Sequence, residues 1–174
     1  MAEVLMDGAR AIAVVDLDAL YAATYRRLVV QMYAICGNLA DAEDAVQEAC
    51  ITAIRKRRVL RTVRNPEAWV RTVALHRLHK GWRHASVVRR HEAADRSPEP
   101  TVEVGPEHVA LVTALSRLDP DQREVVVLHH LADLSVADIA DDLDLPIGTV
   151  KSRLGRGRAR LSELLTDEEV SSDD

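Results

Sequence analysis

A chain of 174 residues can form one or two small domains, and with 3% aromatic residues and no phenylalanine its core must be built from Leu, Val, Ile and Ala. The formal net charge of -5 argues weakly against nucleic acid as a partner. No stretch reaches the roughly 20 apolar residues of a membrane helix, and Glu3 and Asp7 stand where a secretory signal would be basic, so we expect a cytoplasmic protein without membrane insertion.

The first half of the chain predicts a bundle of three helices within residues 16–91. Gly37 supplies a stop signal after the first helix, and Asp41 is the expected N-cap of the second. Asn65 followed by Pro66 predicts the N-cap and first position of the third helix. The three predicted helices span residues 16–36, 41 to about 58, and 66 to about 83.

The second half predicts a domain of four short helices over residues 107–165. Residues 92–106 hold three prolines and a glycine among acids and lack periodicity, so they are expected to be a flexible linker between the domains. An N-terminal extension, residues 1–15, and a frayed acidic tail, residues 166–174, complete the chain. The predicted helices span residues 106–118, 121–132, 136–143 and 147–165. The sequence therefore predicts an all-α fold of two small helical domains.

Basic residues are concentrated in two blocks of an otherwise acidic chain. Between Arg55 and His91 there are twelve Lys and Arg residues and one acid, Glu67. Between Ile147 and Leu161 there are five more basic residues and no acid. Seventeen of the 23 Lys and Arg residues thus lie in two blocks, which predicts two separate surfaces that face a polyanion.

The most specific motif is a helix-turn-helix over Ser135–Leu161, with the sequence SVADIADDLDLPIGTVKSRLGRGRARL. Ile139 faces inward from the first helix, Pro146 forces the turn, and Val150 and Leu154 seat the second helix against the first. The second helix would enter the major groove of DNA, where Arg and Lys pair with phosphates and guanine edges. The residues expected to contact DNA are Thr149, Lys151, Ser152, Arg153 and Arg156.

Gly155 and Gly157 interrupt this proposed recognition helix, and each costs about 1 kcal/mol relative to alanine in a helix interior. Two explanations stay open. The backbone must approach DNA or a partner closely at these positions, or the helix orders only when it is bound.

The two halves of the chain together resemble the extracytoplasmic-function (ECF) sigma factors of group four. The stretch Leu115–Leu165, with LSRLDPDQREVVVLHHLADLSVADIADDL followed by GTVKSRL, is similar to region four, which binds the minus-thirty-five promoter element. DAEDAVQEA at Asp41–Ala49 is similar to the core-binding part of region two, and NPEAWVRTVALHRLHKGWR at Asn65–Arg83 to its promoter-melting part. The resemblance implies a sigma factor that binds RNA polymerase core and promoter DNA and is not an enzyme, with no cofactor.

The resemblance also implies roles for individual residues. Polar residues on the outer face of the second helix would bind the polymerase core: Asp41, Asp44, Gln47 and Glu48. Residues at the start and along the third helix would contact and help to melt the minus-ten element: Asn65, Trp69, Arg71, His76, Arg77, Lys80 and Arg83. Trp69 serves equally well as a core residue. His76 and Lys80 depart from the Asn and Asp that are common in the family, so the promoter preference stays open.

Proteins that resemble this one are commonly inhibited by an anti-sigma factor, which is therefore an expected partner. The main alternative is a stand-alone helix-turn-helix regulator with an N-terminal sensor domain, and a third possibility is a polymerase adaptor that cannot initiate. The neighbouring arginines oppose a metal site at His76 and His79, and no catalytic motif is present. Cys36 and Cys50 are expected to be buried free thiols.

Overall fold

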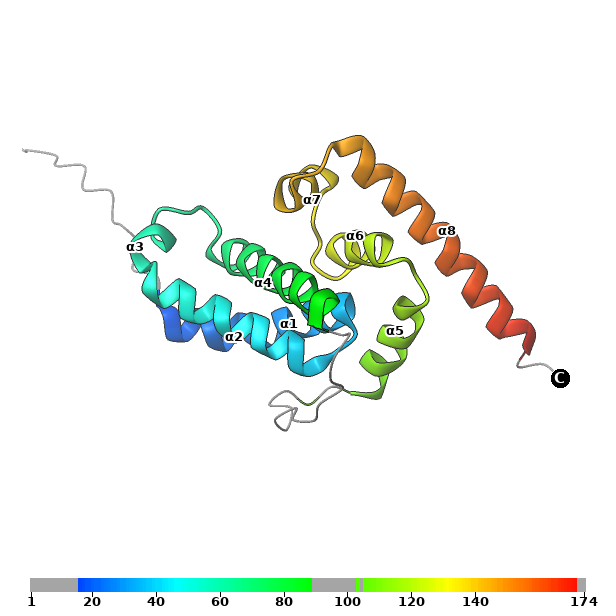
Figure 1. Ribbon diagram of the computed structural model, residues 1–174, viewed down its shortest axis with the longest axis horizontal. Helices are drawn as coiled ribbons and strands as arrows, with labels where there is room; N and C mark the ends of the chain where they lie inside the picture. The colour runs from blue at the N-terminus through cyan, green and yellow to red at the C-terminus, as the bar shows by residue number, and fades with distance from the viewer. Residues whose placement is uncertain (1–15, 89–102, 104, 172–174) are drawn as a thin grey trace, which may run out of the picture.

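The computed structural model describes residues 16–88, 103 and 105–171, and within these ranges the protein is all-α without a strand. This confirms the predicted fold class. The predicted extension, residues 1–15, most of the predicted linker, and residues 172–174 lie outside the described residues. The helices are α1 (Leu17–Cys36), α2 (Leu39–Arg55), α3 (Arg57–Leu60), α4 (Pro66–Val88), α5 (Pro106–Ser116), α6 (Pro120–His130), α7 (Val136–Leu143) and α8 (Ile147–Ser171) (Figure 1).

The ends of the first two helices are set by short polar side chains and one glycine. The Asp16 carboxylate accepts hydrogen bonds from two backbone amides at the start of α1, and Gly37 ends the helix in the left-handed conformation, with φ of 74°. The prediction that Asp41 caps α2 is wrong. Asn38 is the N-cap, because its side chain accepts from the Asp41 amide, and Asp41 lies in the first turn of the helix.

The chain after α2 does not continue as one helix into the basic cluster, as the sequence suggested. The helix stops at Arg55, and Lys56 leaves the helical conformation with φ of -102° and ψ of 28°. A separate turn of helix, α3, follows and places Leu60 in the core with no exposed surface. The break is thus followed directly by a leucine that packs in the core, where burial stabilises the fold.

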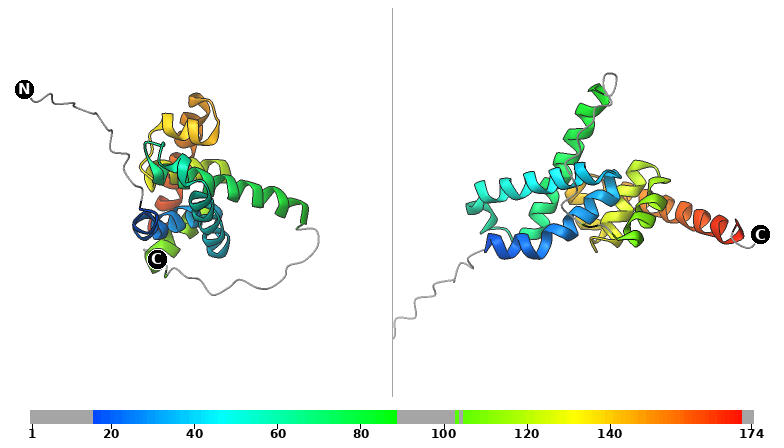
Figure 2. Two further views of the ribbon diagram at one scale, coloured as in Figure 1. Left: turned by 90° about the vertical axis from the view of Figure 1, so that its left-hand side faces the viewer. Right: turned by 90° about the horizontal axis from the view of Figure 1, so that it is seen from below.

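The third predicted helix starts as expected, since Asn65 Oδ1 accepts from the Ala68 amide at 3.1 Å and Pro66 is the first helical residue. The last helix differs from the prediction, because α8 runs for 25 residues to Ser171 and includes much of the supposedly frayed tail. No glycine or proline follows Gly157, so no residue in this stretch stops the helix. Figure 2 shows the C-terminal part of α8 extending away from the other helices.

The two halves of the chain are docked against each other. One continuous core runs from Leu28 and Met32 of α1 through Leu75 of α4 to Leu128 of α6 and Val150 of α8. The first helix packs on α2 and α4 on one side and on α5 and α6 on the other (Figure 1). The inner stripe predicted for α2 is confirmed, with all its members buried: Ala42, Ala45, Val46, Ala49 and Ala53.

Candidate nucleic-acid interface

The helix-turn-helix has the predicted geometry. Ser135 and Asp138 form a reciprocal capping box at the start of α7, and Asp144 ends this helix in the left-handed conformation with φ of 52°. The inward residues Ile139, Val150 and Leu154 are buried, as the sequence predicted. The turn thus holds α8 against α7, and the first turns of α8 stand at the surface.

Four of the five residues predicted to contact the minus-thirty-five element are accessible, and one is engaged inside the domain. Lys151, Ser152 and Arg156 are exposed and Thr149 is half-buried. Arg153 instead pairs with Asp121 of α6 at 2.5 Å, and 21% of its side chain is exposed. This ion pair fixes α8 to the start of α6, so Arg153 has a structural partner in addition to any DNA contact.

The two glycines of α8 differ in their surroundings. Gly157 is buried against α6, where a Cβ atom would come within 2.7 Å of Val126 Cγ2. Gly155 is exposed, and a Cβ there would meet nothing within 4 Å. The helix is continuous through both glycines. The close backbone approach inferred from the sequence is therefore present at Gly157, and its partner is a helix of the same chain.

The acidic face of α2 is open to solvent. Asp41, Asp44, Gln47 and Glu48 are all exposed, opposite the buried alanine stripe. Gln47 Nε2 donates to the Tyr25 hydroxyl at 3.2 Å, and Glu48 lies 3.8 Å from Arg77 of α4. The face is therefore available to a macromolecule, and one of its carboxylates already touches the basic helix.

The residues of α4 that were expected to bind the minus-ten element lie in different environments. His76, Arg77 and Lys80 are exposed, whereas Trp69 is half-buried against the core. Arg83 lies within α4, but its side chain is outside the described part of the chain. Asn65 uses its side-chain oxygen as the N-cap of the helix.

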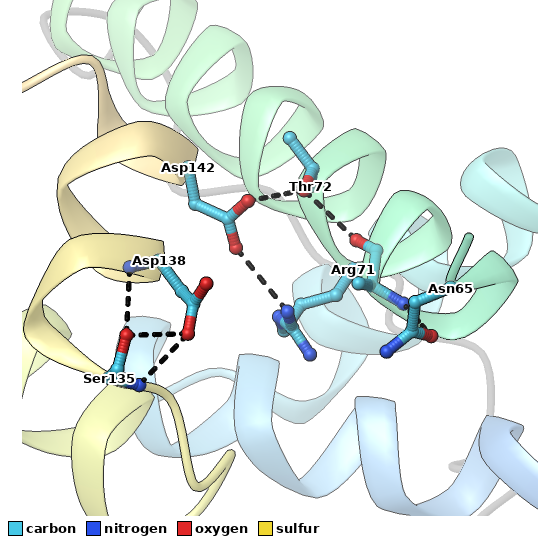
Figure 3. Close-up of polar contacts among 7 residues, drawn as sticks. Asn65, Arg71, Thr72, Ser135, Asp138 and Asp142 are labelled. Atoms are coloured by element: carbon cyan, nitrogen blue, oxygen red, sulfur yellow. Dashed lines mark hydrogen bonds and ion pairs between the residues drawn. The ribbon is translucent and has the colours of Figure 1, made fainter. Parts of the chain in front are cut away.

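Arg71 departs most from the expectation of a free DNA-contacting side chain, because it is 5% exposed and faces the other half of the chain. Its Nη2 lies 3.4 Å from Asp142 Oδ2 of α7, and the second oxygen of that carboxylate lies 2.9 Å from Thr72 Oγ1 (Figure 3). Arg71 and Asp142 border a cleft of about 740 Å³ between α1, α4, α7 and the turn before it. Its lining includes Arg27, Gln31, Asn65, Glu67, Asp138 and Asp141.

A second polar contact joins the same two halves. His79 Nε2 of α4 lies 2.6 Å from Glu124 Oε1 of α6, and Glu124 is 6% exposed. Sequence reasoning missed Thr72, Glu124 and Asp142 as functional candidates. Pairs this far apart in the chain leave no periodic signal, so no pattern in one sequence could have identified them.

Neither a metal site nor a membrane helix is evident in the part of the chain that the structure describes. Within residues 16–88, 103 and 105–171, no three His, Cys, Asp or Glu side chains are grouped in a way that could hold a metal ion. Among the same residues, no helix combines the length and the apolar character needed to cross a bilayer.

Comparison with known proteins gives two family matches in the order that the sequence suggested. Residues 20–87 match the family model for sigma-70 region 2, and residues 108–161 match the model for sigma-70 region 4. Because the first match covers the half that a regulator would use as a sensor, it favours a sigma factor over a stand-alone regulator.

Several sigma factors are similar to the chain along most of its length. The RNA polymerase sigma-E factor of Streptomyces avermitilis is 31% identical over 134 residues, which cover 76% of this chain and 75% of that protein. The ECF RNA polymerase sigma factor EcfG of Rhodopseudomonas palustris is 31% identical over 137 residues, with 75% of each covered. SigM of Mycobacterium tuberculosis is 36% identical over 131 residues, but the match spans only 64% of its length.

Solved structures agree with these sequence matches. The sigma factor RpoE of Bartonella quintana, solved in complex with the anti-sigma factor NepR, superposes with a TM-score of 0.69 at 26% identity, covering 87% of this chain and 97% of RpoE. The ECF sigma factor SigJ of Mycobacterium tuberculosis superposes with a TM-score of 0.59 at 25% identity, covering 88% of this chain and 56% of SigJ. The paired regions and the relatives show that the chain belongs to the ECF RNA polymerase sigma factors of the sigma-70 family.

Proposed function

We propose that the chain binds RNA polymerase core and directs promoter-specific initiation, using three charged surfaces for three tasks. The acidic face of α2 docks on the polymerase, α4 contacts and melts the minus-ten element, and the start of α8 reads the minus-thirty-five element. The observation that carries the proposal is the exposure of Lys151, Ser152 and Arg156 on a helix seated by a helix-turn-helix.

We further propose that the chain is a group four member and acts in the cytoplasm. Its two regions, within residues 16–91 and 107–165, are separated by the short segment 92–106, which leaves no room for a third folded region. Promoter opening then follows from binding energy without a catalytic residue. Unstacking costs a few kcal/mol per flipped base, and phosphate pairing along α4 offsets it.

An anti-sigma factor is a proposed partner of this chain. The support comes from relatives, because RpoE of Bartonella quintana was solved with the anti-sigma factor NepR. The acidic face of α2 and the basic start of α8 are both exposed, so an inhibitor that covered them would block polymerase and promoter together.

Transcription with purified components tests the proposed function. Core RNA polymerase lacking a specificity subunit is incubated with the chain and a randomised promoter pool, and the transcripts are sequenced. We expect a defined start site preceded by two conserved elements. Transcripts without a common upstream sequence, at the level of core enzyme alone, would contradict the proposal. Tight duplex binding without any association with core polymerase would instead support a stand-alone regulator.

A further inference from the structure

We propose that Arg71 and Thr72 form a phosphate site for promoter DNA and that Asp142 of the same chain occupies it in the free protein. The inference rests on the proposed function, and it assigns to that function a regulatory contact. In the docked arrangement, a carboxylate of the minus-thirty-five domain covers part of the helix proposed for the minus-ten element (Figure 3). Asp142 therefore blocks this part of α4 until the halves separate.

Arg71 is buried between the two halves of the chain. Its side chain is 6% exposed, and that of Asp142 is 18% exposed. A guanidinium is costly to bury without an anion, because it is charged at every physiological pH. Asp142 supplies that anion, so the docked state depends on this carboxylate.

Asp142 satisfies the hydrogen-bonding capacity of Arg71 incompletely. It reaches only Nη2 of Arg71, at 3.4 Å, and within the described residues Nε of Arg71 is buried without a hydrogen-bond partner. The Thr72 hydroxyl lies 2.9 Å from both Asp142 Oδ1 and the Ala68 carbonyl oxygen, and its single proton serves one of them at a time. The site thus retains a hydrogen-bond donor, Nε of Arg71, that Asp142 does not use.

The ligand that would use this capacity is an anion with two adjacent oxygens. A DNA backbone phosphate presents two charged oxygens that can engage Nε and a terminal nitrogen of one arginine together, which is the preferred fork geometry. Arg77 and Lys80 are exposed on the same helix, six and nine residues after Arg71, and therefore lie on other faces of α4. Only a ligand longer than one phosphate, such as a nucleic-acid strand that passes around the helix, could contact Arg71 together with either of them.

Other contacts besides that of Arg71 with Asp142 hold the two halves together. Separating the halves also breaks the pair between His79 and Glu124 and the bond from Gln31 Nε2 to the Leu131 carbonyl oxygen at 3.3 Å. The halves bury apolar surface as well, where α1 packs on α5 and α6. Loss of Asp142 alone therefore shifts the population toward open forms without abolishing the docked state.

The test compares Asp142→Asn with Asp141→Asn in the full-length free chain. Both variants remove one negative charge from α7, but Asp141 is exposed and no bond from its side chain to α4 is present among the described contacts. We measure the radius of gyration by small-angle scattering and the affinity for a short single-stranded DNA of random sequence. We expect Asp142→Asn to enlarge the chain and to raise DNA affinity by roughly fivefold, since apparent affinity scales with the competent fraction. Asp141→Asn should change the affinity by less than half of that factor.

Two further measurements make the outcome decisive. The inference requires that binding to core polymerase separates the halves, so in holoenzyme the advantage of Asp142→Asn should disappear. Thr72→Val should also enlarge the free chain, because it removes the other contact to Asp142. Equal size and equal DNA affinity of Asp142→Asn and Asp141→Asn, with native helicity in both, would overturn the inference while transcription could still support the proposed function. Failure of every variant to bind core polymerase would instead overturn the proposed function, whatever the scattering shows.

Discussion

Gly157 of α8 lies directly against Val126 of α6, and a Cβ atom at position 157 would come within 2.7 Å of Val126 Cγ2. Val126 is 3% exposed and β-branched, so it has little freedom to move aside. The helices α6 and α8 therefore approach as closely as they do because position 157 lacks a side chain.

Alanine substitutions at the two glycines of α8 should have opposite effects on stability. Gly157→Ala should lower the free energy of unfolding by about 1 to 2 kcal/mol, because overpacking against Val126 outweighs the gain in helix propensity. Gly155→Ala meets nothing within 4 Å and should raise it by up to about 1 kcal/mol. Urea unfolding followed by circular dichroism measures both values. Stabilisation by both substitutions would contradict the close contact.

Loss of the capping box should weaken the helix that supports the recognition helix. Ser135 Oγ accepts from the Asp138 amide at 3.1 Å, and the Ser135 amide donates to Asp138 Oδ2 at 3.3 Å. Ser135→Ala should cost about 1 kcal/mol of stability, whereas Ser135→Thr should retain most of it because threonine also caps helices. Thermal unfolding distinguishes the two, and an equal loss in both variants would rule out capping as the cause.

The Cys36 thiol should react slowly with alkylating reagents. Burial raises the pKa of Cys36 from 9.0 to about 11, although backbone hydrogen bonding at Asn38 lowers it in part. At pH 8 only about one Cys36 in a thousand is then a thiolate, the reactive form. We expect the iodoacetamide rate to rise about tenfold per pH unit up to pH 10. The Cys36→Ser variant isolates the rate of Cys50, whose thiol pKa burial also raises.

The raised pKa of Cys36 also fixes the sign of a stability change. The unfolded thiol ionises at lower pH than the folded one, so its contribution to stability is complete below the unfolded pKa. The contribution is lost as the pH rises toward 11. Wild-type chain should therefore lose more stability in this alkaline range than Cys36→Ser, and parallel curves for the two would contradict the burial of the thiol.

The proposed surfaces should separate by mutation. Lys151→Ala and Arg156→Ala should each weaken promoter binding, reduce its salt slope by about 1 and leave core association intact. Charge reversal at Asp44 and Glu48 should weaken core association but not binding of the free chain to promoter duplex.

Arg160→Ala provides the matched control for these variants. Arg160 belongs to the same basic block but pairs with Glu163 on α8 at 2.9 Å, so its loss should change DNA affinity least. Fluorescence anisotropy and co-elution with core polymerase provide the two readouts. Loss of both activities in both sets would contradict separate surfaces.

Local patterns predicted most of the secondary structure, because capping residues and apolar spacing act over a few residues. Asn65 with Pro66, Gly37, and the buried stripe of α2 are examples. The N-cap of α2 was misplaced because Asn38 and Asp41 are both good caps, and only the geometry at the end of α1 selects Asn38. Position 157 needs a glycine because it lies against Val126 of α6, about thirty residues away in sequence. A single sequence does not reveal this contact.

The candidate site was predicted unevenly for the same reason. The exposed faces of α2 and α8 follow from helical periodicity within one element. The burial of Arg71 follows from docking between halves, which depends on shape and on Asp142, a residue 71 positions away. The sequence showed that Arg71 is of a type that suits DNA contact. It gave no indication that this side chain would instead pair with another residue of the same chain.

The ribosome synthesises the first half of the chain before the second half that docks on it. The contacts from Gln31, Arg71 and His79 to the second half join residues 100, 71 and 45 positions apart, whereas α1, α2 and α4 pack on one another within the first half. At roughly 5–20 residues per second, the ribosome finishes α4 several seconds before it reaches Asp142. We expect nascent chains arrested before α7 to bind single-stranded DNA more tightly than the released protein. In the most recently synthesised copies in a cell, Arg71 would therefore briefly be free of Asp142.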